Sequence, residues 1–310
     1  MTIQNGLDYY LSCNIVFDEG HCKAWIRQPH LIKRLIDKFG SRVKSMQRYL
    51  TPGTPNMGVR LVKDEEEKLS LEDQTLFQSG VGMLLFLVKH SRPDIANATR
   101  ELSKGMSATN KAGLKELLRV IKYVIDTKSL GLKIEPKIDQ SEHWRMVVFT
   151  DADWAGDKDS RQSVSGYVIY LCGAPIAWRS KAQNHVTLSS SESEYVALSE
   201  AVKELKFITM LLDSMNIGYQ KPITVRVDNI GAIFMAENVN AMGRTRHIDV
   251  RHHFIRDHLD DLITLKFVTS DKNVADIFTK NTLSTIFDNH QSTMVGMRPD
   301  GGVLEKEEGC

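Results

Sequence analysis

The sequence predicts an α/β protein with a mixed five-stranded sheet and flanking helices, preceded by a mainly helical region with a small hairpin. Two observations predict this fold class. The C-terminal half alternates β-rich runs with amphipathic stretches in the order β-β-β-α-β-α-α-β-α. The N-terminal half shows apolar residues at helical spacing after one strand–turn–strand pattern. A length of 310 residues gives room for two domains.

The N-terminal region is expected to begin with a hairpin, in which residues 7–17 and 22–26 form the strands. A helix over residues 28–39 should follow, because its apolar residues recur at helical spacing. Gly40 stands where a C-terminal helix cap is expected. Further helices are expected over residues 71–89, 95–106 and 113–125.

The C-terminal region should hold the sheet. A polar linker over residues 137–145 leads into it, and the polar segment 285–310 is expected to form a disordered tail. The predicted domains are therefore 1–136 and 146–284. Strands are expected at 146–150, 163–172, 176–180, 223–227 and 264–269, and helices at 192–215, 230–237, 250–262 and 273–280.

Charge is divided unevenly between the two regions. Residues 1–145 contain 23 Lys and Arg against 17 Asp and Glu, whereas residues 146–310 contain 17 against 22. A basic region beside an acidic one suits phosphate contact by the first and metal binding by the second. Ordinary variation would explain the same imbalance, because the excess of positive charge is small.

Cysteine usage and hydropathy indicate the compartment. Cys13, Cys22, Cys172 and Cys310 lie far apart and lack the paired spacing of a zinc site or a disulfide framework. This usage is typical of a reducing compartment. No apolar run reaches the roughly 20 residues of a membrane span, and no signal sequence is visible. We therefore expect an intracellular, cytoplasmic protein without a membrane segment.

Acidic residues follow two of the predicted strands. Asp151 is expected to end the first strand, with Asp153 after it, and Asp228 follows the fourth strand. One such acid would simply open a polar loop, since Asp is depleted in strands. If the two strands are neighbours, however, their ends lie about 4.8 Å apart, and two carboxylates there would repel unless a cation lay between them. Such oxygen ligands suit Mg²⁺ or Mn²⁺.

Two further acids begin helices. One is in the segment 189–198, where Ser191 and Glu194 fit a capping box, but Ser189 and Glu192 fit the same template. Capping therefore cannot decide between Glu192 and Glu194. The other is Asp276, in a first helical turn, where Asp is common for electrostatic reasons alone. Four acids in these places predict a two-metal site for phosphoryl transfer.

Five segments of the C-terminal half, in family order, resemble the ribonuclease H domain of copia-type LTR retrotransposon Pol polyproteins. They are Thr-Asp-Ala-Asp-Trp-Ala-Gly-Asp (150–157), Ser-Val-Ser-Gly-Tyr-Val (163–168), Trp-Arg-Ser-Lys-Ala-Gln (178–183), Leu-Ser-Ser-Ser-Glu-Ser-Glu-Tyr (188–195) and Ala-Asp-Ile-Phe-Thr-Lys (275–280).

This resemblance implies a ribonuclease H-like sheet and a metal-dependent endonuclease that cleaves the RNA strand of RNA–DNA hybrids during reverse transcription. It implies that Asp151, Glu194, Asp228 and Asp276 are the catalytic residues and hold two Mg²⁺ ions, with Mn²⁺ as an alternative. The alternative function is that of a catalytically inactive nucleic-acid-binding remnant of a truncated polyprotein. An active element would place the protein in a virus-like particle.

Residues 8–136 resemble the thumb and connection region that follows the polymerase palm in the same polyproteins. The family usually has Gly where Ser12 stands. The Tyr-x-Asp-Asp motif that holds the polymerase metals in the family does not occur in this chain, so we expect no polymerase activity from it alone. The palm and fingers of the same polyprotein are expected partners. The matching pieces are Thr51-Pro52 and residues 81–85, 91–95 and 119–127.

Polar and basic residues outside the acid quartet are candidates for contact with nucleic acid, although each would also be explained as an ordinary surface residue. Cellular and retroviral relatives of this domain often carry a His in the loop before the fourth acid, but residues 270–273 contain none. The candidates are Arg179, Lys181 and Gln183 after the third strand, Asn229 after Asp228, and Arg244, Arg246 and His247.

Overall fold

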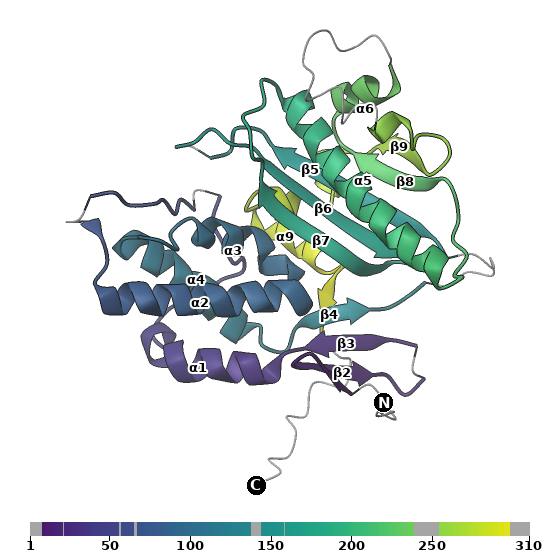
Figure 1. The fold of residues 1–310 in the computed structure, drawn as a ribbon. Helices are drawn as coiled ribbons and strands as arrows, with labels where there is room; N and C mark the ends of the chain where they lie inside the picture. The colour runs from purple at the N-terminus through teal and green to yellow at the C-terminus, as the bar shows by residue number, and fades with distance from the viewer. Residues whose placement is uncertain are drawn as a thin grey trace. The chain divides into compact units, whose positions relative to one another are not determined.

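The computed structural model describes residues 8–20, 22–55, 57–64, 67–137, 144–157, 159–238 and 254–297. They form two compact units (Figure 1). The first contains the described residues up to Glu135, apart from Thr54 and Pro55, together with residues 291–297. The second contains Thr54, Pro55 and the described residues from Pro136 to His290.

The first unit has an antiparallel sheet of five short strands in the order β1-β2-β3-β4-β10. The predicted hairpin is confirmed, with Val16 opposite Trp25. The expected strand 7–17 is interrupted, because Leu11 and Ser12 have positive φ angles of 49° and 63°. A left-handed residue leaves the pleat, and glycine adopts this conformation at the lowest cost. The strands are β1 Tyr9–Tyr10, β2 Cys13–Phe17, β3 Ala24–Arg27, β4 Gly131–Ile134 and β10 Val295–Gly296.

Among its described residues, the first unit also has four α-helices: α1 Pro29–Val43, α2 Leu71–His90, α3 Ala96–Ser103 and α4 Lys111–Asp126. The expectation that Gly40 caps the first helix is wrong. The helix continues through Gly40 because Val43, one turn beyond, is buried with Leu35 and Phe39. Tertiary packing of an apolar face outweighs the low helix propensity of one glycine.

The Ser-Arg-Pro-Asp-Ile segment of the first unit (residues 91–95) contains a fully buried ion pair. The Arg92 guanidinium donates to both carboxylate oxygens of Asp94, at 2.9 and 2.8 Å. The remaining groups are also satisfied, because Arg92 donates to the Thr127 carbonyl and hydroxyl, and the Tyr123 hydroxyl donates to Asp94. A buried charge pair is tolerated only when its donors and acceptors are matched in this way.

Residues 284–297 are ordered. They form α9 Ser284–Gln291 and strand β10, which pairs with β4. Gln291 donates to Asp94 at 3.0 Å and so joins the buried ion pair. The expectation of a disordered tail from residue 285 is therefore wrong for residues 285–297, because buried apolar side chains such as Met294 hold them. Residues 298–310 lie outside the described residues.

The second unit has a mixed five-stranded sheet in the order β7-β6-β5-β8-β9. β5 is antiparallel to β6 and parallel to β8, and β8 is parallel to β9. The predicted fold class, a mixed five-stranded sheet with flanking helices, is confirmed. The strands are β5 Met146–Asp153, β6 Val164–Leu171, β7 Ala174–Ala182, β8 Ile223–Val227 and β9 Ile263–Phe267.

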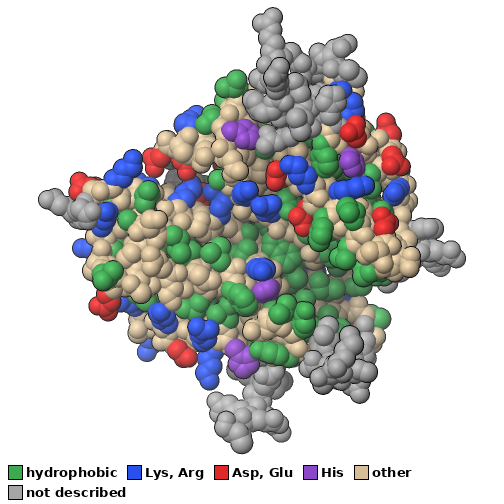
Figure 2. All heavy atoms as spheres, viewed as in Figure 1, with side chains coloured by type: hydrophobic (Ala, Val, Ile, Leu, Met, Phe, Trp, Pro, Cys, Tyr) green, Lys and Arg blue, Asp and Glu red, His purple; other side chains and the backbone are tan. Residues whose placement is uncertain are grey.

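The long helix α5 Ser190–Ser214 covers one face of this sheet (Figure 1). Its buried side packs on alternate strand residues such as Val148 and Ile169. Its outer side carries the exposed apolar residues Phe207, Met210 and Leu211. On the face of the molecule shown in Figure 2, hydrophobic side chains lie among charged ones. Other helices are α6 Ile230–Glu237 and the single turn α8 Asp276–Thr279.

The helix expected over 250–262 lies partly outside the described residues, and the part that is described is helical only to residue 256. The last helix, expected over residues 273–280, shortens to α8 after a 3-10 turn, Ser270–Lys272. Within the part of the chain that the structure describes, no helix combines the length and apolar character needed to cross a bilayer.

The C-terminal segment is predicted to stabilise the folded chain through Met294. Met294→Ala should lower the free energy of unfolding by roughly 2–4 kcal/mol, because it leaves a cavity at a fully buried position. Met297→Ala is the matched control, since 63% of Met297 is exposed, and should change little. Urea unfolding measures both. Equal small effects would show that residues 291–297 do not stabilise the folded state.

Candidate metal centre

Strand register brings the first two acids together. In the parallel pair formed by β5 and β8, Thr150 lies opposite Val227. Asp151 and Asp228 are the next residues on these strands, so their side chains emerge at the same edge of the sheet. The sequence-based expectation that these two acids lie side by side is therefore confirmed by the register.

Asp151 does not end its strand. β5 continues to Asp153, with Asp151 opposite Gly166 and Asp153 opposite Val164 on β6. The strand extends because β6 satisfies its backbone after the ladder to β8 has ended, which outweighs the low strand propensity of Asp. The expected stop at Asp151 is therefore wrong, and this carboxylate projects from a backbone that is paired on the β6 side.

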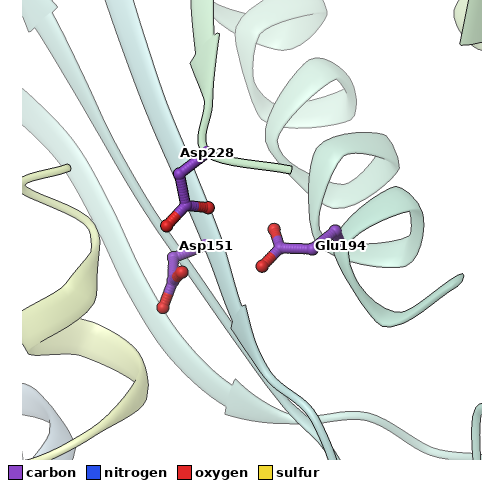
Figure 3. A group of neighbouring side chains, drawn as sticks. All are labelled: Asp151, Glu194 and Asp228. Carbon is purple, nitrogen blue, oxygen red and sulfur yellow. The ribbon is translucent and has the colours of Figure 1, made fainter. Parts of the chain in front are cut away.

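The helix cap separates the two candidate glutamates. Ser189 caps α5 by accepting the Glu192 N–H at 3.1 Å, and the Glu192 carboxylate accepts the Leu188 N–H at 2.7 Å. Glu192 is therefore occupied at the cap, in an arrangement close to a capping box. Glu194 lies on another face of the helix. Its carboxylate faces the two aspartates, as Figure 3 shows.

Asp151, Glu194 and Asp228 form a compact group. One carboxylate oxygen from each lies within 4.8 Å of the others, which is the spacing of ligands around one cation. Two of these residues are buried and Asp228 is partly buried. Ser270 donates a hydrogen bond to Oδ2 of Asp228 at 2.8 Å. The structure thus gathers three of the four predicted acids into a single candidate site.

The fourth acid, Asp276, lies beside this group and not within it. It begins α8, and its carboxylate pairs with the Lys280 ammonium at 3.1 Å. The Thr279 hydroxyl donates to Asp151. Gly166 permits this approach of α8 to the sheet, because a Cβ there would lie 2.8 Å from that of Phe278. A larger residue at this position would move Asp276 and Thr279 away from Asp151.

The acids perturb one another. Burial raises the pKa of Asp151 to about 7, with Asp276 and Asp228 adding to the rise and Lys280 opposing it. Burial also raises the pKa of Glu194 well above its usual range, and the neighbouring charges of Asp151 and Asp228 act in the same direction. Repulsion of this kind is relieved when a cation binds between the carboxylates.

Unpaired carboxylate oxygens are a second indication that the group of three acids binds a divalent cation. The Glu194 Oε2 and Asp228 Oδ1 atoms are buried and accept no hydrogen bond. Buried polar atoms are nearly always paired, so two unpaired carboxylate oxygens beside a third acid indicate a place for a ligand. Hard oxygen donors and negative charge favour Mg²⁺ or Mn²⁺ over softer metals.

The candidate nucleic-acid residues differ in their surroundings. Arg179 and Lys181 are exposed on β7, and Arg179 lies 3.9 Å from Glu200. Gln183 is buried, and its amide donates to the Ser165 hydroxyl and to the Ser193 carbonyl, both at 2.9 Å. The Gln183 amide therefore fixes the start of α5 immediately before Glu194.

The Asn229 side chain has a capping role. It accepts the Ala232 N–H at 2.9 Å and the Ser191 hydroxyl at 3.1 Å, and so caps α6 and joins it to α5. Arg244, Arg246 and His247 lie outside the described residues. Contact of any of these candidates with nucleic acid stays a prediction.

Three residues that support the site were not identified from the sequence. Thr279 and Lys280 follow Asp276 by three and four residues, the spacing at which helical side chains meet, and this signal could have found them. Asn273 is buried and donates to the Thr150 carbonyl at 3.0 Å. No local pattern in the sequence indicates that contact, since Thr150 is distant along the chain.

The raised pKa of Asp151 predicts how stability depends on pH without metal. The folded state keeps this proton up to about pH 7, whereas the unfolded chain releases it near pH 4. The contribution of Asp151 to the free energy of unfolding is therefore fully present below about pH 4 and is lost as the pH rises through about 7.

Asp151→Asn cannot ionise, so it should remove this loss, which is on the order of a few kcal/mol, and be more stable than the parent at pH 8. Its amide oxygen can still accept the Thr279 hydroxyl. Urea unfolding in chelator from pH 4 to 8 measures the effect. An unchanged slope in the variant would contradict the assignment.

Comparison with known proteins places the chain in a family. No protein-family model matches it. It is 34% identical over 223 residues to the retrovirus-related Pol polyprotein from transposon RE1 of Arabidopsis thaliana, a match covering 72% of this chain and 15% of that protein. It is 31% identical over 277 residues to that from transposon TNT 1-94 of Nicotiana tabacum, covering 87% of this chain and 20% of that protein.

Among solved structures, LC11-RNase H1 in complex with RNA/DNA hybrid aligns with 44% of this chain and 94% of its own, with a TM-score of 0.35 and 16% identity. The chain spans between 15% and 20% of the length of the two polyproteins above. On the strength of the polyprotein matches, the chain belongs to the copia-type retrotransposon Pol polyproteins.

Proposed function

We propose that the second unit is a metal-dependent endonuclease that cleaves the RNA strand of RNA–DNA hybrids. The observation that carries this proposal is the group of Asp151, Glu194 and Asp228, whose carboxylate oxygens converge within 4.8 Å. Two of their buried oxygens lack a hydrogen bond, which leaves them available to a cation. Membership of the Pol polyproteins supports a role on nucleic acid.

Each residue of the site has its own proposed role in binding metal or in positioning a ligand. Asp151, Glu194 and Asp228 would hold one divalent ion, and Asp276 would be the fourth ligand of a two-ion site. Two bound ions lower the pKa of an attacking water and stabilise the leaving oxygen of the phosphodiester. The chain supplies the placement, because Thr279 orients Asp151 and Gln183 fixes the turn of α5 that carries Glu194.

Selectivity for RNA would come from contacts to 2′-hydroxyl groups and from groove shape. The exposed cations Arg179 and Lys181 are our candidates for contact with the phosphate backbone. The excess of basic residues in residues 1–145, most of which belong to the first unit, supports the same role for that unit. We also propose that the chain acts inside the cell beside the polymerase palm and fingers of the same polyprotein.

The first test is cleavage of a labelled RNA–DNA hybrid by the full chain, with and without Mg²⁺, beside double-stranded RNA and double-stranded DNA. We expect cleavage of the RNA strand of the hybrid alone, and only with metal. A folded protein that binds the hybrid with a steep salt dependence and leaves it intact would instead support a nucleic-acid-binding remnant.

The two glutamates provide a matched pair of variants. Glu194→Gln should reduce hybrid cleavage at least ~100-fold. Loss of a residue that only orients a metal ligand already costs up to about 100-fold, and Glu194 is proposed to be a ligand itself. Glu192→Gln should keep cleavage within about threefold, because Gln also serves in a capping box. Initial cleavage rates measure both, and circular dichroism checks folding. Equal losses would show that this end of α5 acts only through its structure.

A further inference from the structure

Lys280 is the basic group that pairs with the fourth acid. It follows the single turn α8, one helical turn after Asp276, and its Nζ lies 3.1 Å from Asp276 Oδ1. The two side chains differ in exposure, with 43% of Lys280 accessible against 6% of Asp276. The lysine can therefore move into solvent, whereas the aspartate is held in place.

Lys280 interacts with more of the site than its ion pair. Burial lowers its pKa, but the carboxylates of Asp151, Asp276 and Asp228 outweigh burial and leave the pKa above its ordinary value. The ammonium lowers the pKa of Asp151 and Glu194 in return. Lys280 therefore supplies one positive charge to the same carboxylates that a divalent ion would neutralise.

Asp276 lies outside the group of three converging carboxylates while it pairs with Lys280, although its side chain is within hydrogen-bonding reach of Asp151. Asp151, Glu194 and Asp228 converge within 4.8 Å, and Asp276 is not part of that group. An ammonium at hydrogen-bond distance from Asp276 would repel a second cation bound to the same carboxylate. The ion pair with Lys280 and the binding of a metal ion therefore compete for the Asp276 carboxylate.

We propose that Lys280 is a tethered counter-ion that must leave Asp276 before that carboxylate joins the metal centre. This inference rests on the proposed function and adds an order of events. The first divalent ion binds at Asp151, Glu194 and Asp228, and the second binds more weakly because it displaces Lys280. Lys280 is thus a positioning residue that sets the affinity of the second ion.

Chemical labelling of lysine tests the displacement without any measurement of activity. The full chain is acetylated briefly at pH 8 with and without MgCl₂, and labelling at Lys280 is quantified by peptide mass spectrometry. We expect Mg²⁺ to increase labelling of Lys280 several-fold and to leave that of Lys266, an exposed residue of β9, unchanged. In Asp276→Asn, Lys280 should already be reactive and should not respond to Mg²⁺.

Calorimetric titration with MgCl₂ tests the affinity. Lys280→Met should tighten the second binding step ~10-fold, equivalent to about 1.4 kcal/mol, whereas Lys280→Arg should retain the weak step because it keeps the charge. Lys266→Met controls for net charge and should change the second step less than twofold.

The outcomes separate this inference from the proposed function. Mg²⁺ binding with unchanged labelling of Lys280, or equal effects of Lys280→Met and Lys266→Met, would overturn the counter-ion role and leave the nuclease proposal standing. A folded chain that binds no Mg²⁺ would overturn both. Displacement of Lys280 by Mg²⁺ without hybrid cleavage would support the inference and count against the nuclease.

Discussion

The parallel register between β5 and β8 is the constraint on which the candidate site depends. It places Asp151 beside Asp228 because Thr150 and Val227 are the last pair of the ladder. A slip of one residue would exchange the two faces of the strand. It would bring Val148 out of the core beneath α5, so the hydrophobic pattern that builds the core also fixes the spacing of the acids.

The clustering of these carboxylates is energetically unfavourable without a bound cation. Buried carboxylates lose hydration and repel one another, as the raised pKa values of Asp151 and Glu194 indicate. The fold tolerates them because α5 and the sheet bury a large apolar core next to the site. Thr279 and Lys280 reduce the repulsion only partly, and the remaining negative charge is what a divalent ion would neutralise.

The sequence predicted the fold more completely than the site. Periodicity identified the strands and the long helix because those patterns are local. It failed at Asp151, where pairing with β6 extends the strand, and at Gly40, where burial of Val43 extends the helix. Capping could not decide between Glu192 and Glu194 because both fit the template. The tertiary structure distinguishes them, since Glu192 accepts the Leu188 N–H and Glu194 joins the two aspartates. Gln183 was identified as a polar candidate, but its bond to the Ser193 carbonyl depends on tertiary structure.

The two units show how buried charge differs between a structural and a functional setting. In the first unit, Arg92 and Asp94 neutralise each other, and Tyr123 and Gln291 donate further hydrogen bonds to Asp94. In the second unit, the carboxylates outnumber the cation beside them, and the Glu194 Oε2 and Asp228 Oδ1 atoms accept no hydrogen bond.

Burial and acidity alone do not separate these cases, since Asp94 is as buried as any catalytic candidate. What separates them is whether the protein itself satisfies every oxygen. A matched network stabilises one arrangement and binds nothing more, whereas an unmatched one keeps a persistent affinity for cations. By this criterion the acid group of the second unit is a site for a ligand, and the Arg92–Asp94 pair is part of the scaffold.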